Sequence, residues 1–429
     1  MDRRRSPRLR SQIQATEDGA GLDRRRSPRL HPRTQASQEG ASMTRRIPRR
    51  RRGRSPASLP DDDDILREIF VRLPPTPSSL ARASAVCRRW RGLLADPKFH
   101  RQLCARHRDP PLLGSFVPED HGQRVVFAPM LDPPDRIPPR RFDLGRCGQN
   151  TDVLGCRHGR VLVKDRVPHA EVIVCDPITG DQRTVAYPPD FTRVSVNGAV
   201  LCAAAAADPG HVHGSCYSSP FKLVLVTMYR RHPNRLLACV YSSNTGLWGD
   251  LISLQSPSDI HGKPAVLVGN SLYWLSLING SILEFDLGEN NIAVMMGPPV
   301  THTDRFINHQ IIKAEDGAVG YTMLVYPSLQ MWKRDVDAQG VTTWAPWKTI
   351  GMDTIPGLPP RTERRQRIQG YDEDTDVVLL HVNGTVYMVD LKSMQSTELS
   401  GPLIHIGAYH PLRCFYTPVI REGHGVYDP

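Results

Sequence analysis

Residues 59–74 read LPDDDDILREIFVRLP, a run of aspartates followed by apolar residues. The apolar positions recur at the spacing of one helix face: Ile65, Leu66, Ile69, Phe70 and Leu73. Carboxylates before a helix accept the free backbone N–H groups of its first turn and oppose the positive end of its dipole. The segment therefore predicts a helix that starts at the aspartates and ends at Leu73-Pro74-Pro75, where proline stops it.

The next residues carry a second apolar pattern. Ser78 and Ser79 are candidate caps for a helix that we expect to run without a break through the following apolar positions: Leu80, Ala83, Val86 or Cys87, Trp90, Leu93 and Leu94. Pro97 restarts the chain, and Phe99 and Leu103 give a last short helix one apolar stripe. A module of a few short helices buries only a modest core, so we expect it to depend on a partner.

The spacing of these residues resembles an F-box, the motif by which substrate receptors dock on the Skp-type adaptor of cullin–RING ubiquitin ligases. Leu-Pro, the Ile/Leu positions and Val-Cys-x-x-Trp occur together at the family spacing, and the continuation Asp96-Pro97-Lys98-Phe99-His100 resembles the F-box families of grasses in particular. The resemblance implies that one set of residues faces the adaptor: Leu59, Pro60, Ile65, Leu66, Ile69, Leu73, Pro74, Leu80, Val86, Cys87, Trp90 and Leu93. An unrelated helical bundle with a tryptophan in its core is the alternative.

The formal net charge of +11 comes from the N-terminus. Residues 1–57 contain seventeen arginines and five acidic residues, and the remaining residues are almost neutral. Residues 1–56 are poor in apolar side chains, so we expect a disordered Arg-rich tail. Within it, Arg45, Arg46 and residues 49–54 suggest a nuclear localisation signal, and biased arginine usage is the alternative. The tail lacks the aromatic residues that stack on bases, which disfavours nucleic-acid binding.

Membrane and secretory signals are missing from the sequence. No window approaches eighteen apolar residues, and the N-terminus has no apolar signal core. The nine cysteines are an odd number without a Cys-x-x-Cys pair, which fits a reducing compartment better than a disulfide framework. We therefore expect no membrane partner and an intracellular protein, in the nucleus and/or the cytoplasm.

From residue 109 the sequence changes to short runs rich in β-branched and aromatic residues, separated by Gly, Asn, Asp or Pro. A turn motif recurs at intervals typical of one four-stranded propeller blade: Asp176–Gly180, Ser242–Gly246, Asp286–Asn290, Asp335–Gly340 and Asp390–Ser393. We expect five tryptophans to pack in the interior of this region: Trp248, Trp274, Trp332, Trp344 and Trp347. A pair of β-sandwiches is the alternative architecture.

These patterns predict an α+β multidomain protein. It consists of the tail at 1–56, a helical F-box module at 57–108 and a mainly-β domain at 109–429, which we expect to be a six- or seven-bladed β-propeller with a core separate from that of the module. The segment Val174-Cys175-Asp176-Pro177 also resembles the propeller-like domain that follows the F-box in plant families.

Little in the sequence points to catalysis. Cys202, His211, His213 and Cys216 are zinc-ligand types, but the C-x8-H-x-H-x2-C spacing fits no standard finger, which favours a loop without metal. Residues 372, 374 and 376 are aspartates that alternate along an extended segment, which favours a solvated edge. No phosphate-binding loop, nucleophile elbow or His-Glu-x-x-His motif occurs. We predict no catalytic residue, no cofactor and no metal.

The resemblance implies the substrate-recognition subunit of an SCF-type cullin–RING E3 ubiquitin ligase. The F-box would bind a Skp-type adaptor and through it a cullin, and the β domain would bind an unidentified protein target. A cullin-independent F-box scaffold or regulatory protein is the alternative. A propeller enzyme is the least favoured reading, because it would need a convergent set of acids, histidines or metal ligands that the sequence does not offer.

Overall fold

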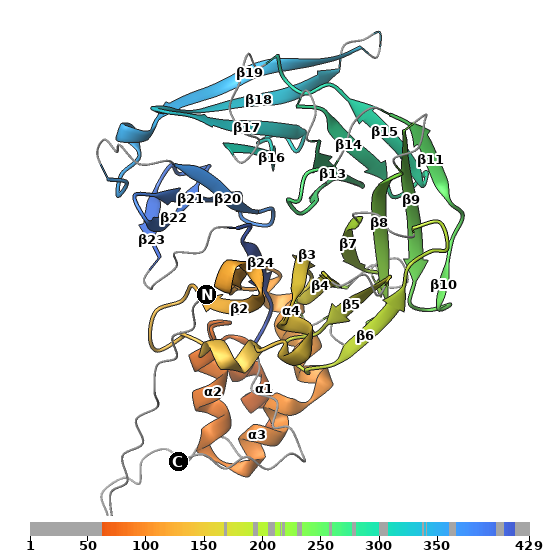
Figure 1. Ribbon diagram of the computed structural model, residues 1–429. Coiled ribbons are helices and arrows are strands. Elements are labelled where there is room, and N and C mark those ends of the chain that lie inside the picture. The colour runs from red at the N-terminus through yellow and green to blue at the C-terminus, as the bar shows by residue number, and fades with distance from the viewer. Residues whose placement is uncertain are drawn as a thin grey trace, which may run out of the picture. The chain divides into compact units, whose positions relative to one another are not determined.

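Four short helices open the described part of the chain (Figure 1). They are α1 (Asp63–Val71), α2 (Pro77–Val86), α3 (Arg88–Ala95) and α4 (Pro97–His107). The computed structural model describes residues 62–416 apart from short segments at 167–169, 192–195, 205–210, 215, 217–218, 230–233, 257–259, 277–279, 300–307, 337–338, 340, 360–365 and 400–406. The Arg-rich tail and two predicted docking residues, Leu59 and Pro60, lie outside the described residues.

Side-chain caps mark the start of α1, α3 and α4. Asp62 accepts the N–H of Asp64 at 2.8 Å, as the acidic run predicts, and Asp96 caps α4 in the same way through Lys98. Two details of the sequence prediction are wrong. Thr76 is the N-cap of α2, and the expected continuous second helix breaks at Cys87, whose backbone is extended at φ −160° and ψ 168°. The Cys87 sulfur accepts the N–H of Trp90, so the break also starts α3.

The β-rich region forms six sheets in the described part of the chain, termed blades one to six. Blades two to six each consist of consecutive antiparallel strands. Blade two contains β3 (Thr151–Arg157), β4 (Arg160–Asp165), β5 (Glu171–Cys175) and β6 (Gln182–Ala186); blade three contains β7 (Val196–Cys202), β8 (Phe221–Tyr229), β9 (Arg235–Ser242), β10 (Leu247–Trp248) and β11 (Ile252–Gln255). Blade four contains β12 (Val266–Val268), β13 (Ser271–Leu275), β14 (Ile282–Asp286) and β15 (Asn291–Met295).

Blade five contains β16 (His309–Lys313), β17 (Val319–Val325), β18 (Ser328–Val336) and β19 (Thr342–Gly351), and blade six contains β20 (Arg367–Asp372), β21 (Val377–Val382), β22 (Thr385–Asp390) and β23 (Ser396–Glu398). The blades follow one another around a common centre (Figure 1). In blades two to six the first strand lies innermost, and neighbouring innermost strands contact one another, as β3 does with β7 and β16 with β20. This arrangement is a β-propeller.

Blade one closes the ring by joining both ends of the β domain. It pairs β2 (Arg124–Pro129) with β1 (Leu112–Glu119), and β1 with β24 (His410–Arg413), in which His410 lies opposite Phe116. β24 contacts both β20 and β3, so it occupies the innermost position between blades six and two. The propeller prediction is therefore confirmed with six blades, and the pair of sandwiches is wrong.

The recurring turn motif marks the same place in five blades. Asp176–Gly180 joins β5 to β6, and Asp286–Asn290 joins β14 to β15. In both turns, and in the turn that starts at Asp390, the first aspartate accepts backbone N–H groups two and three residues on. An Asx turn suits a tight connection between the outer two strands, and this local chemistry is why the motif could be read from the sequence.

The tryptophans bind blades to their neighbours. Trp274 is fully buried, whereas Trp332, Trp344 and Trp347 are partly buried against the apolar core of blades four to six. The indole N–H of Trp344 donates to the carbonyl of Met296, next to blade four, at 2.8 Å. That of Trp248 in blade three donates to Ala186 of blade two at 2.9 Å. The prediction that the tryptophans pack in the interior is confirmed for Trp274 and holds in part for the other four, which are partly buried.

The apolar core of the helical module also includes residues of the propeller, so the two parts meet in this core, although the blades keep apolar clusters of their own. Phe415, just after β24, is 1% exposed and packs with Leu66, Phe70 and Phe99 of the helices. Val212 of the β7–β8 connection packs against the same cluster. Residues 59–429 accordingly form one compact unit. The strand that closes the propeller ring also anchors the helices.

Candidate adaptor-docking and target-binding surfaces

The first helix presents apolar side chains to solvent. Ile65 and Ile69 lie one turn apart on α1 and are 49% and 44% exposed, and Val86 at the end of α2 is 55% exposed. Exposure of large aliphatic side chains to water is unfavourable in free energy, which favours their burial against another surface. These three are the large aliphatic side chains that are exposed among the described residues of the predicted docking set.

The rest of the predicted docking set divides by burial. Leu66, Leu80 and Leu93 are buried in the module's own core, so their direct role is to hold the helices together. Pro74 and Cys87 are exposed, and Leu73 and Trp90 are partly buried. The Trp90 ring meets the buried Phe70 ring edge to face with centroids 4.8 Å apart, which fixes the orientation of α3 on α1. Assignment of all twelve residues to the adaptor stays a prediction.

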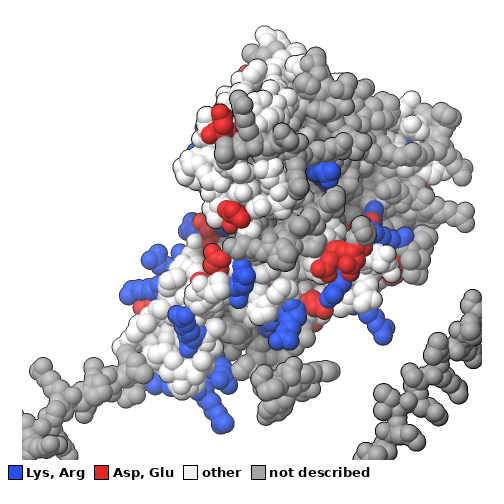
Figure 2. Space-filling view, turned by 60° about the vertical axis from the view of Figure 1, so that its left-hand side comes forward, with Lys and Arg blue, Asp and Glu red and all other residues white. Residues whose placement is uncertain are grey.

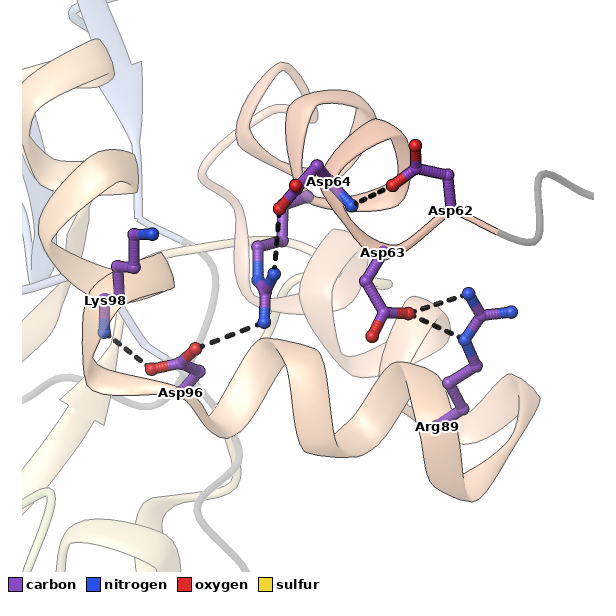
Figure 3. A network of polar contacts seen from close by, with 7 residues as sticks. Asp62, Asp63, Asp64, Arg89, Asp96 and Lys98 are labelled. Atoms are coloured by element: carbon purple, nitrogen blue, oxygen red, sulfur yellow. Dashed lines mark hydrogen bonds and ion pairs between the residues drawn. The ribbon is translucent and has the colours of Figure 1, made fainter.

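A polar network fixes the start of α1 against the rest of the module (Figure 3). Arg67 binds Asp64 at 3.1 Å and Asp96 at 3.4 Å, which joins the first turn of α1 to the cap of α4. Arg89 of α3 binds Asp63 at 2.7 Å. Aspartates of the acidic run thus pair with arginines of the module. These pairs fix the position of α1, the helix that carries the exposed isoleucines.

Charged side chains surround the helices. Exposed residues of α3 and α4 include Arg88, Arg91, Lys98 and Arg101. Figure 2 shows basic and acidic side chains interspersed over the lower part of the described surface, which corresponds to the helical end in Figure 1. Exposed apolar side chains and exposed charged side chains thus occur together on the helices, a composition compatible with a protein–protein interface.

The propeller has a cavity at the end of the ring where the innermost strands begin. Its volume is about 850 Å³, and it is lined by the first residues of β3, β7 and β24 together with residues 260–262 before β12. Polar side chains line it: Asp152, Lys164, Arg166, Asn197, His261 and His410. We term this cavity the channel mouth. It was not predicted, because its residues come from four blades and have no local motif.

The polar groups of the channel mouth are held in position. Arg166 binds Asp152 at 2.7 Å, Lys164 donates to the carbonyl of Val196 at 3.0 Å, and Asn197 donates to the carbonyl of His261 at 2.9 Å. Burial lowers the pKa of Lys164, and it lowers that of His261 to about 4 and that of His410 to about 3. Both histidines are neutral at pH 7, and the cavity offers fixed donors, acceptors and one carboxylate, Asp152, that pairs with both Arg166 and Lys164.

A buried ion-pair cluster occupies the end of the ring where the innermost strands finish. Arg157 of β3 contacts Glu373 through two nitrogens, at 2.5 and 2.8 Å, and Arg413 of β24 binds Asp372 at 2.8 Å. The predicted solvated edge is wrong for Asp372 and Asp376, which are 3% and 6% exposed. The partner of Asp372 comes from the distant strand β24, whereas Asp376 is bound by Tyr371 and Lys392 of its own blade.

A group of four metal-ligand types lies at this same end. Cys202, His211, His213 and Cys216 each direct one ligand atom into a cluster whose atoms all lie within 4.8 Å of one another. Their spacing in the sequence fits no standard finger and favoured a loop without metal, but the end of β7 and the following connection bring the four together. None of the described helices is long and apolar enough to cross a membrane.

Comparison with known proteins agrees with this architecture. Residues 57–106 match the F-box-like family, and residues 152–419, more than half of the chain, match the family described as F-box protein AT5G49610-like, beta-propeller. None of the curated proteins compared matches the chain.

Several solved structures have a distant likeness to the chain. One is the extracellular domain of the one-component system BT4673 from B. thetaiotaomicron, with 13% identity and a TM-score of 0.32 over 66% of this chain, which spans only 29% of that one. Others are U3-55K (11% identity, TM-score 0.32, 59% of this chain and 82% of that one) and the Myceliophteria thermophila Cps50 (Swd1) β-propeller domain (10%, 0.34, 69% and 89%). At these scores the likenesses add nothing to the argument. The family matches agree with the six-bladed ring and the four short helices before it, and the chain belongs to the AT5G49610-like F-box β-propeller family.

Proposed function

We propose that this chain is the substrate-recognition subunit of an SCF-type cullin–RING ubiquitin ligase. The observation that carries the proposal is the pairing of an F-box-like module, which exposes Ile65 and Ile69 on one helix face, with a propeller that has its own polar cavity. In this function Ile65, Ile69 and Val86 bind a Skp-type adaptor, and the adaptor recruits a cullin. F-box and propeller domains are typical of non-catalytic adaptors, so the chemistry belongs to other subunits.

The proposed contribution of the chain to ubiquitination is proximity. A target held on the propeller meets the ubiquitin carrier at a high effective concentration, so transfer to a target lysine becomes effectively intramolecular. The shared core at Phe415 supports this role, because a helical module fixed to the propeller limits the positions that the target can take.

We place the target at the channel mouth. The helices pack around Phe415, directly after the last residues of β24, whereas the channel mouth is lined by the residues where β24 and β3 begin. A target bound there does not compete with the adaptor for space. The fixed Arg166–Asp152 pair and the carbonyl-bound Lys164 suit a polar or charged peptide segment.

We propose a nuclear pool for the protein, which depends on the arginine cluster between Arg45 and Arg54 and on a near-neutral remainder without a competing basic segment. A cytoplasmic pool is compatible with the same function. The particular resemblance of this chain to the F-box families of grasses stays a prediction.

Affinity purification from plant cells, with and without proteasome inhibition, tests the proposed function. We expect wild-type protein to bring down a Skp-type adaptor and a cullin, and to enrich a target when the proteasome is inhibited. The variant Ile65→Asp with Ile69→Asp should lose the adaptor and cullin, and Lys164→Ala with Arg166→Ala should lose the target but keep the adaptor. Adaptor without cullin would support the cullin-independent scaffold instead.

A further inference from the structure

The connection from β7 to β8 contains an arrangement of side chains that the proposed function does not use. Cys202 is the last residue of β7, and His211, His213 and Cys216 follow it before β8. The Nε2 atom of His211 lies 3.4 Å from the sulfurs of both Cys202 and Cys216, and the Nδ1 atom of His213 lies 3.4 Å from the Cys216 sulfur. From these contacts we propose that the four side chains bind a structural Zn²⁺ ion.

The distances fit the geometry of tetrahedral zinc. With bonds of about 2.3 Å to sulfur and about 2.0 Å to nitrogen, neighbouring sulfur and nitrogen ligands lie about 3.5 Å apart. The three cysteine–histidine contacts are all close to this separation. Two thiolates and two neutral imidazoles also balance the charge of the ion, so the complete site is neutral and compatible with its partly buried position.

Neighbouring groups hold the ligands from behind. The N–H of Ala204 donates to the Cys202 sulfur at 3.5 Å, the type of backbone contact that favours a thiolate. The His158 ring stacks on the His213 ring, with centroids 3.6 Å apart and planes 13° apart, and its Nδ1 accepts the N–H of Cys202 at 3.0 Å. Arg160 donates to the carbonyl of Cys216. At metal sites, contacts of this kind orient the side chains that bind the metal directly.

Four protein ligands make a closed site, which points to a structural rather than a catalytic ion. What it would stabilise follows from its position. Val212, between the two histidines, packs against the helical core, and the carbonyl of Gly214 accepts the N–H of Phe415 at 2.9 Å. Gly214 has a φ of +129°, and a Cβ there would lie 2.5 Å from the Phe415 ring. The ion would therefore fix the segment that joins the helical module to the propeller.

Metal analysis of the untagged full-length chain, purified without chelator, tests the proposal. We expect one zinc per chain by inductively coupled plasma mass spectrometry. X-ray absorption spectroscopy at the zinc edge should report two sulfur and two nitrogen ligands. Cys202→Ser and Cys216→Ser should each lose the bound zinc. Cys239→Ser is the matched control, because this buried cysteine of blade three contacts a backbone carbonyl that serine can also reach, and it should retain zinc.

Measurements on the unchanged protein keep the test independent of variant folding. After chelation, added Co²⁺ should produce the visible absorption of a tetrahedral thiolate site, and zinc should displace it. The proposal is overturned by substoichiometric zinc in wild-type protein refolded with zinc present, by a disulfide between Cys202 and Cys216, or by equal zinc loss in Cys239→Ser.

Discussion

The guanidinium of Arg157 and the carboxylate of Glu373 form a buried two-point ion pair between non-adjacent blades. Arg157 ends β3 of blade two, whereas Glu373 follows β20 of blade six, and β24 lies between them. Blade four joins the pair, because Arg157 donates to the carbonyl of Ala265 and Glu373 accepts the N–H of Leu267. One salt bridge thus links three blades at the end of the ring nearest the helices.

Removal of one partner should leave a buried, uncompensated charge. We expect Glu373→Gln to lower the free energy of unfolding by about 3–5 kcal/mol in urea denaturation. The double variant Arg157→Met with Glu373→Met should cost less than the single one. Glu68→Gln in the exposed Arg72–Glu68 pair is the control and should change stability little, because solvent screens that pair. A loss no larger for Glu373→Gln than for Glu68→Gln would mean that the buried pair does not join the blades.

Phe415 should control the attachment of the helices. Phe415→Ala removes a fully buried ring from the helical core and should cost about 3–5 kcal/mol. Hydrogen exchange should then accelerate in α1 to α4 more than in blades two to five. Phe142→Ala, at an equally buried phenylalanine of the propeller, is the control and should affect the strands of blade one first. Unchanged exchange in the helices of Phe415→Ala would show that the two parts do not share a core.

The burial of His410 predicts loss of stability in acid. Burial holds its folded pKa at about 3, below the ordinary value of about 6.5. The unfolded chain therefore binds a proton between these values that the folded chain does not. The contribution to stability is almost complete at pH 7 and is lost as the pH falls toward 3, and the histidine alone should cost about 1.9 kcal/mol between pH 7 and pH 5.

Denaturation of His410→Gln at both pH values isolates this effect. The variant should show a smaller stability difference between pH 7 and pH 5 than wild type. Leu412→Ala, two residues along the same strand, should be destabilised by a similar amount at both pH values, because it removes only apolar burial. An unchanged pH dependence in His410→Gln would assign the acid sensitivity to other groups.

The sequence predicted what local chemistry determines. The apolar spacing around Ile69 revealed α1, and the aspartate turns at Asp176 and Asp286 revealed the blade repeat, because both signals depend on near neighbours in the chain. It could not separate Leu66 from Ile65, since packing of α1 on Phe415 decides which of two adjacent apolar residues is buried.

Long-range pairing explains the remaining errors. Asp372 looked like a surface acid because its partner Arg413 lies 41 residues away, on the strand that closes the ring. The Cys202–Cys216 segment looked like an ordinary loop because its ligand spacing fits no local finger, and only the end of β7 brings the four atoms together. The channel mouth had no signal, since four separate blades supply its lining.

Nuclear import should depend on the run of four arginines at residues 49–52 of the tail. In a fluorescent fusion, Arg49, Arg50, Arg51 and Arg52 changed to Ala should reduce the nuclear fraction, because an import receptor binds closely spaced cations. The matched control changes Arg24, Arg25 and Arg26, which lie in residues 23–30, a repeat of residues 2–9, and it should leave import intact. Equal nuclear fractions in the two variants would mean that the arginines at 49–52 are not an import signal and reflect only biased arginine usage.

Adaptor binding by the exposed face of α1 is the central claim, and calorimetric titration of the purified full-length chain with a purified Skp-type adaptor tests it most directly. Wild type should bind, and Ile65→Asp with Ile69→Asp should weaken binding at least about a hundredfold, because two charges replace apolar side chains at the centre of the interface. Leu247→Asp with Met296→Asp makes the same chemical change at exposed apolar positions of the propeller and should bind like wild type. Equal affinity for the adaptor in the two double variants, or no binding by wild type, would contradict the assignment of the helical module as an adaptor-docking F-box.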